Sequence, residues 1–178
     1  MKKFGLLLCT MFAGILTMYG QGAKNIKINE VLTNNTANLQ DEFGNRRAWI
    51  ELANTSFSTY DVRGMYITTD RRVLNKGLSV PQRIKMMSCI PNGDNRTSMS
   101  AREHLLFFFN SNPSHGTLHL SAQISKDKPT WIALYDGNAV DIIDSVTVPP
   151  LAANQSYARI KDGADQWAVK TSDCVTPG

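Results

Sequence analysis

The chain has 178 residues, with 19 basic and 15 acidic side chains and a net charge of +4. Without Lys2 and Lys3, which precede the part expected to fold, 17 basic residues face 15 acidic ones, and the net charge is +2. So small a surplus does not support a nucleic-acid-binding protein, because phosphate recognition needs many cations gathered on one face.

Residues 1–20 read as a secretory signal peptide. Two lysines form the basic start, residues 6–16 form an apolar run, and a small residue precedes Gln21, the expected new N-terminus. The alternative is an uncleaved signal anchor, but the apolar run is shorter than the ~20 residues that span a bilayer. We therefore expect an exported protein, periplasmic or elsewhere in the cell envelope or secreted, with one domain over residues 21–178.

Residues 26–70 contain three short segments in which apolar residues alternate with polar ones. The segments are IKINEVLTNN, DEFGNRRAWIELAN and YDVRGMYITTD, and turns rich in Asn, Asp and Gly separate them. This pattern is typical of short strands in a β-sandwich.

The second half of the chain continues the β pattern. Further strands are expected at residues 105–109, 118–122, 131–135, 139–148, 156–160 and 167–169. The LLFFF run at 105–109 is expected to be a central strand buried on both faces, and the turn at 136–138 is expected to close a hairpin. No helical period follows the signal peptide, so the predicted fold class is an all-β sandwich.

Residues 71–104 interrupt this regularity and are expected to form a long inserted loop with a weakly helical part at 82–87. Connections of this length are often functional or mobile, so we expect an interaction surface here; the alternative is a decorated loop without a partner. Replacing residues 82–98 by a short linker is then expected to leave the sandwich folded. The adaptable, cationic residues proposed for contact are Arg71, Arg72, Met86, Met87 and Arg96.

Catalytic, metal and cofactor motifs are not evident in the sequence. His115 and His119 have an i, i+4 spacing but lack a third nearby ligand. Asp141 and Asp144 would point to opposite faces of a strand, which does not suit shared acid–base work. No G-x-S-x-G or H-E-x-x-H occurs. We expect a non-catalytic protein that needs no cofactor and no metal.

Two cysteines, Cys89 and Cys174, remain after removal of the signal peptide. In an oxidising compartment they would either form one disulfide that closes a long loop or stay as two free thiols. The sequence leaves both alternatives open, because a disulfide needs Cα atoms within ~7 Å of each other.

Several of these segments resemble the lamin-tail family, an immunoglobulin-like domain of nuclear lamins and of many bacterial surface and secreted proteins. The motif residues are Ile28, Glu30, Trp49, Glu51, Leu52, Asn54 and Gly64, and the segment SYAR at 156–159 is similar to the closing motif. The resemblance implies an immunoglobulin-like β-sandwich that binds or spaces. Met65 departs from the family pattern, which commonly has an aromatic residue there, and the 71–104 segment is longer than usual.

These motif residues are best explained as architecture. We expect Trp49 to bury on the order of 200 Å² in the core. Gly64 is suited to a bulge or a close backbone approach, and Asn29 and Asn54 are suited to hydrogen bonds that hold turns.

A narrower resemblance concerns MKKFGLLL, QGAKNIKINEV, ITTDRRVL and LAANQSYAR. They look like the extracytoplasmic lamin-tail portion of small gamma-type subunits of sodium-pumping decarboxylases from Bacteroides-like bacteria. The resemblance implies a helper role in a membrane complex, with decarboxylase subunits as partners and a membrane span that this chain, ending at Gly178, does not contain. A free-standing secreted or surface adhesion module is the alternative, and an exported hydrolase has only weak histidine and carboxylate signals behind it.

Overall fold

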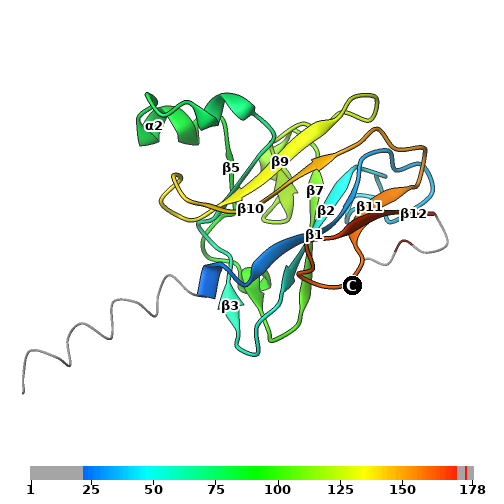
Figure 1. The fold of residues 1–178 in the computed structure, drawn as a ribbon, viewed down its shortest axis with the longest axis horizontal. Coiled ribbons are helices and arrows are strands. Elements are labelled where there is room, and N and C mark those ends of the chain that lie inside the picture. The colour runs from blue at the N-terminus through cyan, green and yellow to red at the C-terminus, as the bar shows by residue number, and fades with distance from the viewer. Residues whose placement is uncertain (1–21, 172–174, 176–178) are drawn as a thin grey trace, which may run out of the picture.

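The computed structural model describes residues 22–171 and residue 175, so the expected signal peptide lies outside the described residues. The described chain is built mainly of β-strands, with a few short helical turns (Figure 1). The all-β prediction is therefore confirmed. No helix in this part of the chain is long and apolar enough to cross a bilayer.

Two sheets and a short ribbon make up the fold. The larger sheet has six strands in the order β12-β11-β1-β2-β7-β8, and all neighbours are antiparallel except β7 and β8. Its strands are β1 (Ile26–Leu32), β2 (Trp49–Asn54), β7 (His104–Phe109), β8 (His119–Leu120), β11 (Ser156–Arg159) and β12 (Trp167–Lys170).

The smaller sheet has four antiparallel strands in the order β10-β9-β4-β5, and the ribbon pairs β3 with β6. The strands are β4 (Tyr66–Thr68), β5 (Ser88–Cys89), β9 (Thr130–Tyr135) and β10 (Ile142–Val148), with β3 (Tyr60–Asp61) and β6 (Ser98–Met99) in the ribbon. The helical turns are η1 (Arg71–Leu74), α2 (Val80–Ile84), η2 (Asn95–Thr97) and η3 (Pro113–His115).

The main core lies between the two larger sheets. Alternating residues of β1 and β2, such as Ile28 and Leu52, face the core together with Phe107 of β7. Ile132 and Leu134 of β9 join the same cluster from the smaller sheet. Period-two alternation thus gives each sheet an apolar inner face, and burial of the two inner faces against each other produces the sandwich-like arrangement.

A second apolar cluster covers the opposite face of the six-stranded sheet. Leu32, Trp49 and Phe108 are buried there, with Leu106 and Val175 packed against them. Because Ile50 and Leu52 face the main core, β2 is buried on both faces. The run at 105–109 is buried only in part, since its first two residues are partly exposed.

Residues 71–104 are not an irregular loop. They contain η1, α2, β5, η2 and β6, and β5 pairs with β4 to complete the four-stranded sheet. Ile90 and Met99 are fully buried in the main core. The expectation that residues 82–98 can be removed without unfolding the sandwich is therefore wrong, because the deletion would take away β5 and Ile90.

Cys89 lies in β5, at the edge of the smaller sheet, and the residue is exposed to solvent. Partial burial of its thiol raises the pKa above its ordinary value, although a hydrogen bond with Tyr66 acts in the other direction. Cys174 lies outside the described residues.

Candidate functional site

Two motif glutamates lie opposite each other on β1 and β2, on the face of the larger sheet that carries Trp49. Glu30 and Glu51 are register partners and are fully buried. Ser156 Oγ donates a hydrogen bond to Glu30 Oε1, and Lys170 Nζ lies 3.3 Å from Glu30 Oε2. Asn29 Nδ2 donates to Glu51 Oε1 over 3.0 Å. These buried carboxylates are thus held by neighbouring strands, as buried charges require.

A β-bulge interrupts the pairing of β1 and β2 between Ile28 and Glu30. The amide of Ile28 donates to Asp144 Oδ2 over 2.8 Å, and the Ile28 carbonyl accepts from Arg159 Nε over 2.8 Å. Asp144 and Arg159 also form an ion pair of 2.8 Å, with side chains only 12% and 4% exposed. Asp144 and Arg159 thus satisfy the amide and the carbonyl of Ile28, and their ion pair joins β10 of the smaller sheet to β1 and β11.

The motif residues Asn54 and Gly64 hold turns. Asn54 Nδ2 donates to the carbonyls of Ser58 and Ser100, each over 2.8 Å, and its Oδ1 accepts from the amide of Ser56. Gly64 lies between β3 and β4 with a φ of 75°, a backbone conformation that residues other than glycine rarely adopt. In the described structure the motif residues therefore serve the framework.

Two of the arginines proposed for contact are neutralised within their own turns. Asp70 caps η1 and binds the guanidinium of Arg72, and Asp94 caps η2 and binds Arg96 in the same way. Hydrogen bonds from these guanidinium groups lower the pKa of Asp70 and of Asp94 below the ordinary aspartate value. The repeated pattern Asp-x-Arg is visible in the sequence and could have signalled the pairing.

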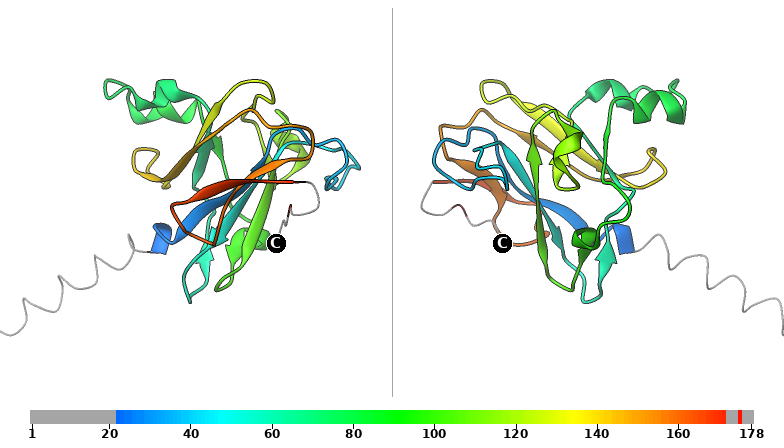
Figure 2. Two further views of the ribbon diagram at one scale, coloured as in Figure 1. Left: turned by 45° about the vertical axis from the view of Figure 1, so that its right-hand side comes forward. Right: turned by 180° about the vertical axis from the view of Figure 1, so that it is seen from behind.

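The remaining proposed residues gather at one end of the smaller sheet. The guanidinium of Arg71 lies 5.5 Å from the ring centroid of Trp131, and Met86 and Met87 pack against the cluster that contains Trp131. Arg96 is not part of this group. Its turn η2 runs directly into β6 beside β3, far from the α2 end of the molecule (Figures 1 and 2).

An open hollow of about 410 Å³ lies beside Arg71. Its lining residues are Thr69, Arg71, Gln123, Ile124, Ser125, Lys128, Pro129, Thr130 and Trp131. A second hollow of about 230 Å³ shares Thr69 and Gln123 and includes Lys85, Met86 and Met87. The sequence analysis did not identify residues 121–130 as part of a candidate binding surface. Lys126 and Lys128, directly before the WIALY strand, were the available signal.

The structure brings His115 and His119 together, with ring centroids 5.5 Å apart. Asn110 Nδ2 lies 3.1 Å and 2.6 Å from their Nδ1 atoms, and Asn110 Oδ1 accepts from the amide of Asn112. That second bond fixes the orientation of the amide, so both Nδ1 atoms act as acceptors. His119 Nε2 pairs with Glu42 over 3.0 Å.

This histidine arrangement is already filled by protein groups. Within residues 22–171 and at residue 175, no set of three His, Cys, Asp or Glu side chains is placed to hold a metal ion. His104 lies apart from the pair, 3.4 Å from Asp162. Burial raises the pKa of the Glu42 carboxyl, but hydrogen bonds from its own amide and from His119 outweigh burial, and the pKa is lowered.

Asp41 anchors the loop that carries Glu42, and acid is expected to loosen this loop. Burial raises the pKa of Asp41, yet hydrogen bonds from the amides of Asn45 and Phe43 and from Arg47 lower it below 3.8 overall. A carboxyl with a lowered folded pKa stabilises the protein above its unfolded pKa and loses that contribution as the pH falls through the folded value. The free energy of unfolding should therefore fall as the pH is lowered below about 4.

Urea unfolding at several pH values between neutral and strongly acidic conditions measures this dependence. Asp41→Asn should be less stable at neutral pH and should show a flatter acid limb than the wild-type protein. An acid limb of unchanged slope in Asp41→Asn would contradict the assignment to Asp41.

Comparison of the sequence with protein-family models gave no match, and comparison with curated proteins gave none.

Proposed function

We propose that this chain is a non-catalytic exported domain of the lamin-tail type, an immunoglobulin-like β-sandwich that holds a protein partner in the cell envelope. The supporting observation is that the motif residues and the residues proposed for contact lie in different places in the fold. Motif residues such as Trp49 and Glu51 are buried in the framework, whereas Arg71, Met86 and Met87 line two open hollows at one end. A binding surface of this kind combines a cation with adaptable apolar side chains.

In the narrower form of this proposal, the partner is a membrane complex. The chain would be the extracytoplasmic part of a gamma-type accessory subunit of a sodium-pumping decarboxylase, as its resemblance to those subunits suggests. A free-standing secreted or surface adhesion module is the second candidate, because the same hollow would serve a partner outside the cell.

The weak hydrolase signals in the sequence do not gain support from the geometry. Asp144 is engaged by Arg159, and His119 by Asn110 and Glu42. A general base needs a reacting group within hydrogen-bond reach, and protein groups already occupy these positions.

The α2 region provides a test that spares the core. Residues 76–85 contribute no buried side chain, so a short Gly-Ser linker in their place should leave the sandwich folded. Tagged wild-type protein should recover a defined envelope protein after cross-linking, and the shortened variant that also carries Arg71→Ala should lose it. Recovery of decarboxylase subunits favours the accessory subunit, and recovery of external proteins alone favours adhesion. A folded variant that recovers every wild-type partner would contradict binding at this end.

A further inference from the structure

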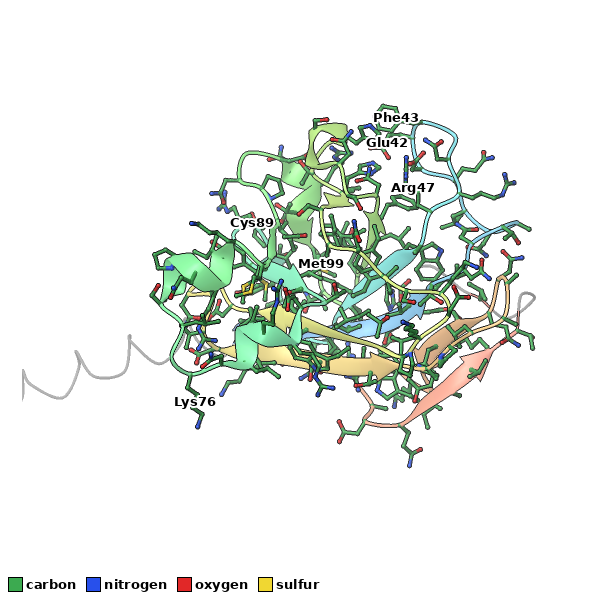
Figure 3. All side chains as sticks on the ribbon, turned by 90° about the horizontal axis from the view of Figure 1, so that it is seen from above. Glu42, Phe43, Arg47, Lys76, Cys89 and Met99 are labelled. Carbon is green, nitrogen blue, oxygen red and sulfur yellow. The ribbon has the colours of Figure 1, made fainter. Side chains whose placement is uncertain are left out.

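Positive charge is concentrated at the end of the molecule that carries the hollow. Residues 69–90 and 121–131 together contain seven basic and two acidic residues, a net charge of +5. The rest of residues 21–178 contains ten basic and thirteen acidic residues, a net charge of −3. Figure 3 shows Lys76 projecting outward at this end, on the side of the molecule away from Glu42 and Phe43. The modest overall charge therefore conceals a strongly polarised surface.

Most of these cations are not compensated inside the protein. Arg72 pairs with Asp70, and Lys126 lies 3.4 Å from the Asp127 carboxylate. In the part of the chain that the structure describes, no carboxylate forms an ion pair with Arg71 or Lys128. These two unpaired cations line the same hollow.

Local hydrogen bonds shape the hollow. Ser125 Oγ accepts from the amides of Asp127 and Lys128 over 3.3 Å and 3.2 Å, which folds the turn that carries Lys128. Thr69 Oγ1 donates to the Gln123 carbonyl over 2.8 Å and ties the opposite wall together. On the third side the Trp131 ring supports the Arg71 guanidinium. A guanidinium that lies over an aromatic ring keeps N–H groups available for a carboxylate.

We propose that this hollow binds carboxylate side chains of an acidic peptide segment in the partner protein, with Arg71 and Lys128 as the two recognising cations. The inference rests on the proposed function, because it names the chemistry of the partner for the same end of the molecule. A concave site suits inserted side chains rather than a flat membrane surface. The hollow is open, whereas small-molecule sites enclose most of their ligand. Ile124, Pro129 and Trp131 add apolar lining that suits a peptide better than a phosphate backbone.

Fluorescence anisotropy tests the proposal with a labelled peptide of alternating Glu and Ser and a matched peptide of Gln and Ser. The purified protein should bind the Glu peptide, lose affinity as salt is raised, and ignore the Gln peptide. The double variant Arg71→Ala/Lys128→Gln should bind at least about tenfold more weakly, because it lacks two charge-assisted hydrogen bonds. The double variant Arg72→Ala/Lys126→Gln removes the same net charge from self-paired positions, and its affinity should change by no more than about threefold.

Five results would overturn the proposal. The first is no binding of the Glu peptide at low salt, and the second is equal weakening of binding in both double variants, which indicates a diffuse electrostatic field. The third is displacement of the peptide by glutarate at equal carboxylate concentration, which indicates a small-molecule site. The fourth and fifth are preferential binding to phosphatidylglycerol vesicles and self-association of the protein, if either is lost in Arg71→Ala/Lys128→Gln.

The outcomes also separate this inference from the proposed function. If the wild-type protein recovers an envelope partner but does not bind the Glu peptide, the proposed function is supported and the proposed recognition of acidic side chains is rejected. If the peptide binds as described but no envelope protein is recovered, the carboxylate-binding site is supported and the proposed envelope partner is rejected.

Discussion

Replacing Trp49 by alanine is expected to lower the free energy of unfolding by about 3–5 kcal/mol. The side chain is fully buried on the outer face of the six-stranded sheet, where it packs with Leu32 and Phe108. Its Nε1 has no hydrogen-bond partner among the described residues, so the expected loss comes from packing. The measurement is a urea or guanidinium unfolding curve of each protein.

Phe57 supplies the matched control, because the residue is 82% exposed and its ring contacts the Arg102 guanidinium at the surface. Phe57→Ala should change the free energy of unfolding by about 0.5 kcal/mol or less. A Trp49→Ala midpoint equal to that of the wild-type protein would show that this second cluster does not contribute to stability.

Asp144→Ala is expected to cost about 3–5 kcal/mol, because it leaves the buried Arg159 charge without its carboxylate and the Ile28 amide without its acceptor. Asp141→Ala is the control on the same hairpin. Asp141 is exposed and accepts a side-chain hydrogen bond from Asn138 over 2.7 Å, so its removal should cost about 1 kcal/mol or less.

A double variant refines this second prediction. Asp144→Leu/Arg159→Met removes both buried charges and should recover part of the stability lost in Asp144→Ala, since no isolated charge remains. Chemical denaturation of the four proteins measures the differences. Equal stability of Asp144→Ala and Asp141→Ala would show that the ion pair does not contribute to holding β10 against β1.

The local alternation of apolar and polar residues was sufficient to predict the longer strands and the fold class. The predicted segments around Trp49, Trp131 and Tyr157 coincide with β2, β9 and β11, because a period of two places apolar residues on one face wherever one face is buried. Other boundaries differed. The expected strand at 118–122 is reduced to β8, which pairs in parallel with the end of β7, and the expected strand at 139–148 begins three residues later, at Ile142.

Pairings between distant segments were not encoded in any local pattern. Residues 71–104 look like a loop because their strands are two residues long, and only contact with β4 and β3 makes them strands. The bond between Arg159 and Asp144, and the hollow between Arg71 and Lys128, join segments whose separate sequences contain no sign of each other.

By itself, therefore, the sequence determined that this protein is all-β and which residues form its longer strands, because alternation is a property of neighbouring residues. Only the tertiary structure decided which cations remain unpaired and gather at one hollow. Asp70 and Asp94 engage Arg72 and Arg96 locally, whereas Arg71 and Lys128 meet at one hollow only because β4 and β9 pair in the smaller sheet. The physical reason is that charge compensation depends on distances in space, which folding sets across long separations in the chain.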